Sequence, residues 1–180
     1  MKKGVLATLL FVYLAASGHL YAQSQAPAST PNYPFVKGYM SFIIPWVKLD
    51  KNQATWEFQD ATTIGFPVGL NVYYSNTFGF SFEITPSVQW SQPSGKPGTS
   101  KTNNLLFDPG PIFRFKNGFN IIPRLAFETQ GRYGLTPVFN KIYARTKDVD
   151  YWFSLSLPVR FGNNEPASVG LNLQIGFTFN

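Results

Sequence analysis

Two reactive residue types are nearly absent from this sequence. It has no cysteine, and its single histidine is His19. Without cysteine, neither disulfides nor a thiolate metal site can hold the chain together. Without a histidine beyond the N-terminal segment, the hydrolases that activate a serine or a water through histidine are disfavoured. We therefore expect no enzyme, no metal and no cofactor.

Charge and long apolar runs are scarce as well. Charged residues make up 13% of the chain, against roughly 25% in ordinary soluble domains. Removing Lys2 and Lys3 from the 15 basic residues leaves 13 against 9 acidic ones, a net charge of +4 that is too small to indicate a nucleic-acid partner. Beyond the N-terminal segment, no apolar run approaches the roughly 20 residues that a membrane helix requires. If the protein lies in a membrane, it must cross as strands.

The N-terminus has the layout of a secretory signal. Two lysines precede an apolar run over residues 5–16, and small, turn-prone residues follow. We predict a signal peptide over residues 1–22 with cleavage after Ala22, and a cut after Gly18 is the alternative. No cysteine follows either site, so we expect no lipid anchor at the new N-terminus.

The rest of the chain predicts a flexible leader over residues 23–34 and one β-domain over residues 35–180. Residues 64–74 alternate between apolar and polar side chains without interruption, and the same period returns over residues 78–90. The short connection 75–77 makes these two segments a hairpin. Asn117 and Gly118, which tolerate positive φ, predict another hairpin turn. The other predicted strands are 36–46, 105–116, 119–130, 151–161 and 169–179.

These seven strands are one short of a closed membrane barrel, which needs an even number when both ends lie on one side. We place the eighth strand at residues 135–146, where alternation is poor but β-branched and aromatic residues are frequent. A strand of about 11 residues tilted near 40° spans about 27 Å, the thickness of the hydrocarbon layer. Long polar loops at 48–61 and 91–104, opposite tight turns, are typical of outer-membrane barrels.

The polar face of the strands decides between a membrane barrel and a soluble one. A soluble barrel would carry many Lys and Glu there, but this face is mostly Gly, Ser, Thr, Asn and Gln, which suit a narrow lumen. We expect its few charges to pair and close the lumen, because an unpaired buried charge is costly. The alternative is a polar permeation path. The predicted lumen charges are Glu83, Asp108, Arg114, Arg124, Glu128 and Arg160, and the first pair expected to meet is Glu83 with Arg124.

The apolar face carries aromatic residues where the strands end, in two sets. Such sets are typical of the girdles at membrane interfaces, although aromatic residues also favour strands in general. One set is Trp46, Trp90 and Phe161, and the other is Tyr74, Phe78, Phe115, Phe119 and Tyr151. Prolines within the strands fit less well, because each lacks a ladder N–H. They are Pro45, Pro67, Pro86, Pro109, Pro111, Pro123, Pro137 and Pro158.

This pattern of hairpins resembles the small eight-stranded outer-membrane barrels of the OmpA-transmembrane and OmpX type, and more particularly the uncharacterised barrels common in Bacteroidetes-like bacteria. The last segment, GLNLQIGFTFN, is similar to the signal read by the barrel-assembly machinery, except that Asn180 follows the aromatic Phe179. The resemblance implies an antiparallel up-and-down transmembrane β-barrel in the outer membrane of a Gram-negative cell. Its implied partners are outer-membrane lipid and the barrel-assembly machinery.

The function expected on these grounds is a structural or surface-interaction role without catalysis, with the surface ligand unknown. One alternative is a porin-like narrow channel for small or apolar solutes. Another is a soluble periplasmic binding barrel, which would turn the apolar faces inward.

Overall fold

The computed structural model describes residues 32–51, 53–57, 61–91 and 100–180, and Asn32–Asn180 form one compact unit. The predicted signal peptide and most of the predicted leader lie outside the described residues. Apart from one short 3₁₀ turn at Lys116–Gly118, the regular structure of the described part is antiparallel β. Its strands are β1 (Phe35–Asp50), β2 (Gln53–Trp56), β3 (Ala61–Gly65), β4 (Val68–Tyr73), β5 (Phe78–Ser91), β6 (Ser100–Phe107), β7 (Gly110–Arg114), β8 (Phe119–Glu128), β9 (Arg132–Arg145), β10 (Val149–Ser156), β11 (Val159–Gly162) and β12 (Ser168–Phe179).

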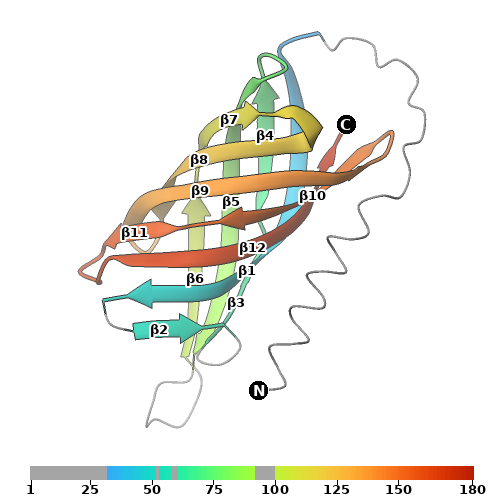
Figure 1. The fold of residues 1–180 in the computed structure, drawn as a ribbon. Helices are drawn as coiled ribbons and strands as arrows, with labels where there is room; N and C mark the ends of the chain where they lie inside the picture. Colours follow the sequence, from blue (N-terminus) through green and yellow to red (C-terminus); the bar gives the residue numbers. More distant parts are fainter. Residues whose placement is uncertain (1–31, 52, 58–60, 92–99) are drawn as a thin grey trace. The chain divides into compact units, whose positions relative to one another are not determined.

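These strands close into a ring of eight barrel strands (Figure 1). Three barrel strands are interrupted once and consist of β3 with β4, β6 with β7, and β10 with β11. The ring closes where β1 pairs with β12, from Tyr39 opposite Thr178 to Asp50 opposite Ser168. The predicted eight-stranded up-and-down barrel is therefore confirmed. Among the described residues no helix is long and apolar enough to span a membrane.

The eighth strand lies where it was predicted, but it begins earlier. β9 starts at Arg132 and pairs with β8 on one side and with β10 and β11 on the other. From Arg132 the alternation is clear, since Arg132, Thr136, Val138 and Asn140 are buried. The predicted segment 135–146 omits the beginning of β9 at Arg132, so it contains only part of the alternation.

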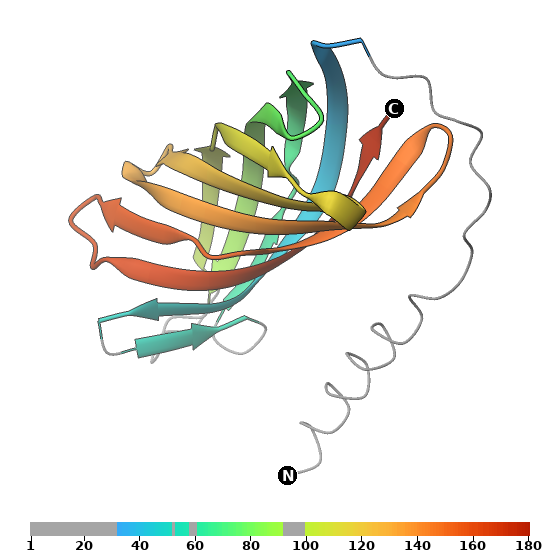
Figure 2. The same cartoon turned by 45° about the horizontal axis from the view of Figure 1, so that its top comes forward.

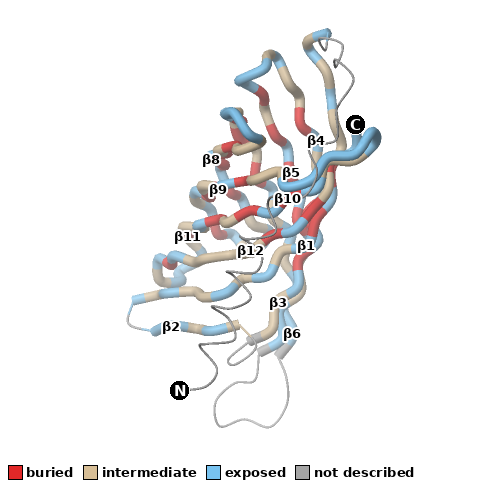
Figure 3. The backbone as a smooth tube through the Cα atoms, turned by 45° about the vertical axis from the view of Figure 1, so that its right-hand side comes forward, coloured by how far each residue is buried: buried red, intermediate tan, exposed pale blue. Residues whose placement is uncertain are grey.

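The barrel is polar inside and apolar outside. Among the described residues, seventeen polar or charged side chains are buried, against seven apolar or aromatic ones, of which one is Pro67. The buried positions recur along the strands in Figure 3 at every second residue. On β4, Val68 and Leu70 are about half exposed while Asn71 is buried. A soluble barrel would show the reverse, because it must bury its apolar side chains.

Tight turns occupy the end of the barrel where the described part begins and ends. Asn117 and Gly118 have φ of 61° and 71°, the left-handed values that the dipeptide predicted. At the same end Asn180 donates from its backbone N–H to the carbonyl of Asp148, 2.8 Å away, and its side-chain amide contacts Thr146 and Lys147. The last residue therefore fastens β12 to the turn between β9 and β10.

At the opposite end, the predicted loop over residues 48–61 is wrong in its first half. β1 continues to Asp50 and turns at Lys51, whose φ is 40°, so that β2 pairs back on it from Gln53 to Trp56. The β-branched and apolar residues that flank this turn continue the ladder beyond the expected strand. This hairpin extends the barrel wall (Figure 2). Likewise, residues 100–104 of the second predicted loop belong to β6, while residues 92–99 lie outside the described residues.

The strand prolines are accommodated in three ways: three lie at interruptions, Pro45 lies at a bulge, and Pro86, Pro111, Pro123 and Pro137 lie inside continuous strands. The breaks between β3 and β4, between β6 and β7, and between β10 and β11 fall at Pro67, Pro109 and Pro158. A bulge at Pro45 shifts the register between β1 and β12. The proline carbonyls remain in the ladder, with N to O distances between 2.8 and 3.0 Å: Ser41 donates to Pro67, Phe66 to Pro86, Leu125 to Pro109, Leu157 to Pro137, and Gly170 to Pro158.

Candidate functional site

A buried charge cluster fills the middle of the lumen. Arg124 of β8 places Nη1 2.7 Å from Glu83 Oε2 of β5, and the same atom lies 3.8 Å from Asp108 Oδ2, between β6 and β7. All three side chains are 5% exposed or less. Arg124 Nη2 also donates to Tyr39 Oη at 3.0 Å, and that hydroxyl donates to Glu83 at 2.8 Å. We call Tyr39, Glu83, Asp108 and Arg124 the plug.

Neutral side chains from further strands complete the plug on its flanks. Gln174 of β12 donates to Ser41 Oγ at 2.8 Å and to Glu83 Oε2 at 3.4 Å, and Ser154 of β10 donates to Gln174 at 3.2 Å. Thr85 donates to the second oxygen of Glu83 at 3.2 Å. The network therefore joins strands all around the ring, and it leaves Asp108 Oδ1 without a hydrogen-bond partner.

Between the plug and the tight turns the lumen is nearly filled. Ile112, Ile122 and Val138 form a small apolar cluster against Tyr73. The guanidinium of Arg114 lies 4.5 Å from the centre of the Tyr73 ring. The remaining cavity on this side measures about 40 Å³.

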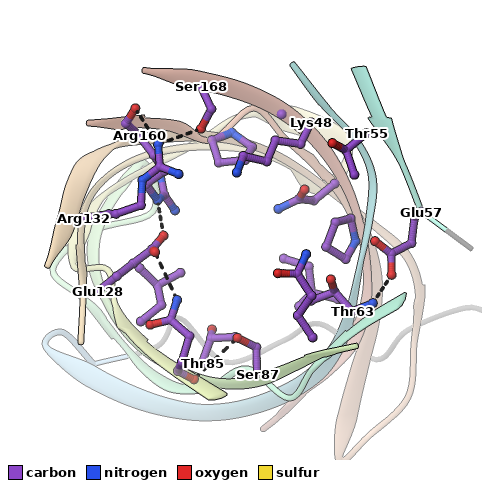
Figure 4. A pocket seen from close by; sticks show the side chains of 18 of the residues that line it. Lys48, Thr55, Glu57, Thr63, Thr85, Ser87, Glu128, Arg132, Arg160 and Ser168 are labelled. Atoms are coloured by element: carbon purple, nitrogen blue, oxygen red, sulfur yellow. Dashed lines mark hydrogen bonds and ion pairs between the residues drawn. The ribbon is translucent and has the colours of Figure 1, made fainter. Parts of the chain in front are cut away.

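On the other side of the plug the lumen opens into a much larger cavity of about 340 Å³, which we call the vestibule. It lies at the end of the barrel that carries the β1–β2 hairpin, and its lining side chains point inward from around the ring (Figure 4). Three cationic residues line it, Lys48, Arg132 and Arg160. Three acidic ones do so too, and these are Glu57, Glu128 and Glu165.

The vestibule charges are bound to partners within the barrel. Arg160 Nε donates to Glu128 at 2.6 Å, and Arg132 Nη1 donates to Glu165 at 2.7 Å. Arg132 Nη2 reaches the carbonyls of Arg160 and Pro166 as well. Lys48 lies 3.8 Å from Asp50. The carboxylate of each paired acid therefore neutralises a cation of the wall.

Glu57 differs from the other vestibule acids, because it accepts from the backbone N–H of Thr63 rather than from a cation. Partial burial raises the pKa of the Glu57 carboxyl, and the Thr63 N–H opposes this shift. Glu57 lies beyond the last paired residue of β2, at the mouth of the barrel.

The six predicted lumen charges do not form one network. The structure brings Glu83, Asp108 and Arg124 together in the plug, and it pairs Glu128 with Arg160 at the vestibule. Arg114 is separate from both groups and stacks on Tyr73. Sequence reasoning missed Arg132 and Tyr39. Arg132 could have been found, because it continues the inward alternation of β9 toward the start of that strand. The sequence contains no signal that the hydroxyl of Tyr39 would be buried.

The predicted girdle aromatics lie largely on the outer face. Seven of them are more than a third exposed, and Phe119 is half-buried. Neighbouring rings contact one another in pairs, such as Tyr74 with Phe78 at 6.2 Å between centroids and Phe115 with Phe119 at 5.9 Å. Tyr133, which pairs with Phe161 at 6.4 Å, belongs to the same outer face and was not predicted.

Within the part of the chain that the structure describes, no cluster of His, Cys, Asp and Glu could hold a metal ion. No protein-family model matches the chain, and no curated protein does. The fold is similar to the crystal structure of Ail, the attachment invasion locus protein of Yersinia pestis, in complex with the heparin analogue sucrose octasulfate. Its TM-score is 0.54 at 8% identity, over 80% of this chain and 96% of that one.

A second crystal structure of Ail gives a TM-score of 0.52 at 7% identity, with the same shares of the two chains covered. A de novo designed transmembrane β-barrel matches with a TM-score of 0.42 at 7% identity, over 79% of this chain and 93% of that one. At such low identity the likeness to Ail shows the fold alone. The fold is that of a small outer-membrane β-barrel.

Proposed function

We propose that this protein is a closed, non-catalytic barrel of the Gram-negative outer membrane, of the OmpA-transmembrane or OmpX type, with a structural or surface-interaction role. The observation that carries the proposal is the plug. Glu83, Asp108 and Arg124 are almost fully buried and bound to groups from opposite sides of the wall, so solute cannot pass without breaking them apart. Separating buried ion pairs is strongly unfavourable.

The outer face supports the placement in a membrane. Side chains such as Phe42, Leu70 and Ile175 are more than half exposed. Lipid tails can cover these side chains without breaking a hydrogen bond, because the side chains are apolar and the backbone is paired within the barrel. Export through the predicted signal peptide, and insertion by the barrel-assembly machinery acting on the terminal strand, belong to the same proposal. So does the absence of catalysis, which rests on a sequence without cysteine and with His19 as its only histidine.

Conductance in a planar lipid bilayer tests the closed lumen. We expect the refolded wild-type protein to give no steady current. The triple variant Glu83→Ala, Asp108→Ala, Arg124→Ala serves as the open control, because it removes every charged group of the plug. Steady wild-type currents that resemble those of the triple variant would refute the closed barrel.

A narrow channel is the second candidate, and the two cavities favour it. The lumen is hollow on both sides of the plug, with about 340 Å³ on one side and about 40 Å³ on the other, so a rearrangement of few side chains would connect them. Swelling of liposomes in small neutral solutes separates the candidates. A channel should make the liposomes swell faster than liposomes without protein, by an amount that falls as the solute becomes larger, whereas a closed barrel should leave the rate unchanged.

A further inference from the structure

The vestibule is a blind pocket. It opens at the end of the barrel that carries the hairpin, and the plug closes its floor. Its volume of about 340 Å³ falls within the roughly 300–1,000 Å³ of small-molecule sites. Most of its lining residues lie on strands from around the ring, so the β-ladder fixes the outline of the pocket (Figure 4).

The charges of the vestibule do not favour an ion. Cationic and acidic lining residues are equal in number, and Arg132 and Arg160 are already bound to Glu165 and Glu128. Arg160 Nη1 is also engaged, by the carbonyls of Leu135 and Val159. An anionic ligand would have to displace these carboxylates, and a cationic one would have to displace the guanidinium groups. A neutral ligand displaces neither.

The groups left for a ligand are amides and hydroxyls next to small apolar surfaces. Among the described residues, the side chains of Gln89, Thr102 and Asn172 line the cavity and have no hydrogen-bond partner. An amide offers both donors and acceptors, and a hydroxyl offers one donor with two lone pairs. Pro45 and Pro158 add apolar surface to the lining. Sugar rings present the matching chemistry, since they carry hydroxyls at their edges and C–H groups on their faces.

We propose that the vestibule binds a neutral saccharide of one or two rings, held by Gln89, Thr102 and Asn172. This inference rests on the proposed closed barrel, because the plug supplies the floor of the pocket. It goes beyond that proposal by naming the site and the chemical class of the ligand.

Saturation-transfer NMR on the refolded full barrel tests the site with lactose, maltose, cellobiose and sucrose as probes. The detergent must be lauryldimethylamine oxide, because maltoside headgroups are themselves neutral sugars and would compete. We expect at least one disaccharide to bind the wild type. Its affinity should fall at least about tenfold in Gln89→Ala with Asn172→Ala, where two hydrogen bonds are lost.

The matched control is Gln53→Ala with Asn103→Ala, two amides near the same end of the barrel that do not line the cavity. It should bind as the wild type does. Thr102→Trp, which fills the exposed mouth, should abolish binding. Every variant is first shown to fold by its gel shift on boiling.

Three results would overturn the proposal: no binding of any neutral disaccharide, equal binding by all variants, or tighter binding of a sulfated disaccharide than of its neutral parent. The conductance measurement is independent of these results. A barrel that is closed and binds no sugar contradicts the saccharide site alone, and a barrel that conducts contradicts the closed lumen.

Discussion

At the scale of single residues, the plug is defined by an imbalance of charge. Arg124 serves two buried carboxylates, Glu83 at 2.7 Å and Asp108 at 3.8 Å. The oxygen Asp108 Oδ1 has no partner. Burial without full pairing is expensive, so removing one member affects the other two. The stability of the barrel should therefore depend strongly on these three positions.

We predict that Arg124→Ala lowers the free energy of unfolding by about 3–5 kcal/mol, because it leaves the buried carboxylates of Glu83 and Asp108 without their cation. Glu83→Ala should cost less, because Arg124 keeps Asp108 as a partner at 3.8 Å. Urea unfolding of the refolded protein, followed by tryptophan fluorescence, measures the loss. Replacement of the whole cluster by Glu83→Leu, Arg124→Met and Asp108→Asn should cost much less, since no buried charge then remains.

Arg145→Ala is the control for these variants. Arg145 is about half exposed and its Nε lies 3.7 Å from Asp150, so its removal should cost at most about 1 kcal/mol. Equal losses at Arg124 and Arg145 would show that the lumen is wet and that its charges are screened by water.

The residue pair Glu83 and Arg124 follows from the sequence because each lies five residues beyond a tight turn on strands that run in the same direction. Height along a barrel can be counted from turns. Contacts that involve β1 or β12 cannot be predicted by counting from turns. They depend on the stagger between the first and last strands, where the ring closes. That is why Tyr39 and Gln174 were absent from the predicted network.

At the scale of elements, the inward Gly134 of β9 lies close to β11, whereas Gly38 of β1 lies on the outward face of its strand, next to Leu70 and Phe179. A Cβ on Gly134 of β9 would lie 1.9 Å from the carbonyl oxygen of Val159 on β11, whereas one on Gly38 of β1 would meet only side-chain atoms at 3.9 Å. The two glycines therefore differ in whether a methyl group can be added without moving backbone.

We predict that Gly134→Ala destabilises the barrel by about 1–3 kcal/mol or more, because backbone must shift to admit the methyl group. The fraction that still migrates as the folded form on an unheated gel measures the effect. Gly38→Ala should leave that fraction unchanged. If both variants behave alike, the close contact between β9 and β11 does not limit assembly.

The strands with regular alternation were predictable, and the extensions and interruptions were not. Residues 64–74 keep their faces even though the ladder breaks at Pro67, because a proline changes hydrogen bonding but not the pleat. The β1–β2 hairpin was read as a loop, since charged and polar residues at 48–53 hide a turn that depends on a left-handed Lys51. The residue types in this segment do not indicate that Lys51 adopts a left-handed backbone conformation.

At the scale of the whole molecule, the inverted distribution of side chains requires an apolar solvent. We predict that the mature protein in detergent gives a pure β circular dichroism spectrum and migrates faster on gels before boiling than after. The physical reason is a closed ladder without edges, which detergent does not open below a high temperature. Recovery as a soluble monomer without detergent would end the membrane assignment.

Topology in the cell can be tested with proteinase K. Residues 92–99 contain no apolar residue except prolines, and the ends of β5 and β6 that they connect lie opposite the tight turns. We predict that the protease cuts within residues 92–99 of intact cells and leaves the remaining strands whole. Protection in intact cells, with cleavage only after lysis, would show that the barrel is inserted the other way.

The outward apolar face determines which substitutions the sequence can accept. A protein core is close-packed, so each buried side chain must fit its neighbours in shape. Lipid tails are fluid and as apolar as leucine, and they adapt to whatever shape they meet. Positions such as Val68, Leu70 and Ile175 therefore need only be apolar, and one such residue can replace another there without a compensating change. About half of the positions in each strand can change in this way, so a sequence identity as low as the 8% to Ail is compatible with the same fold.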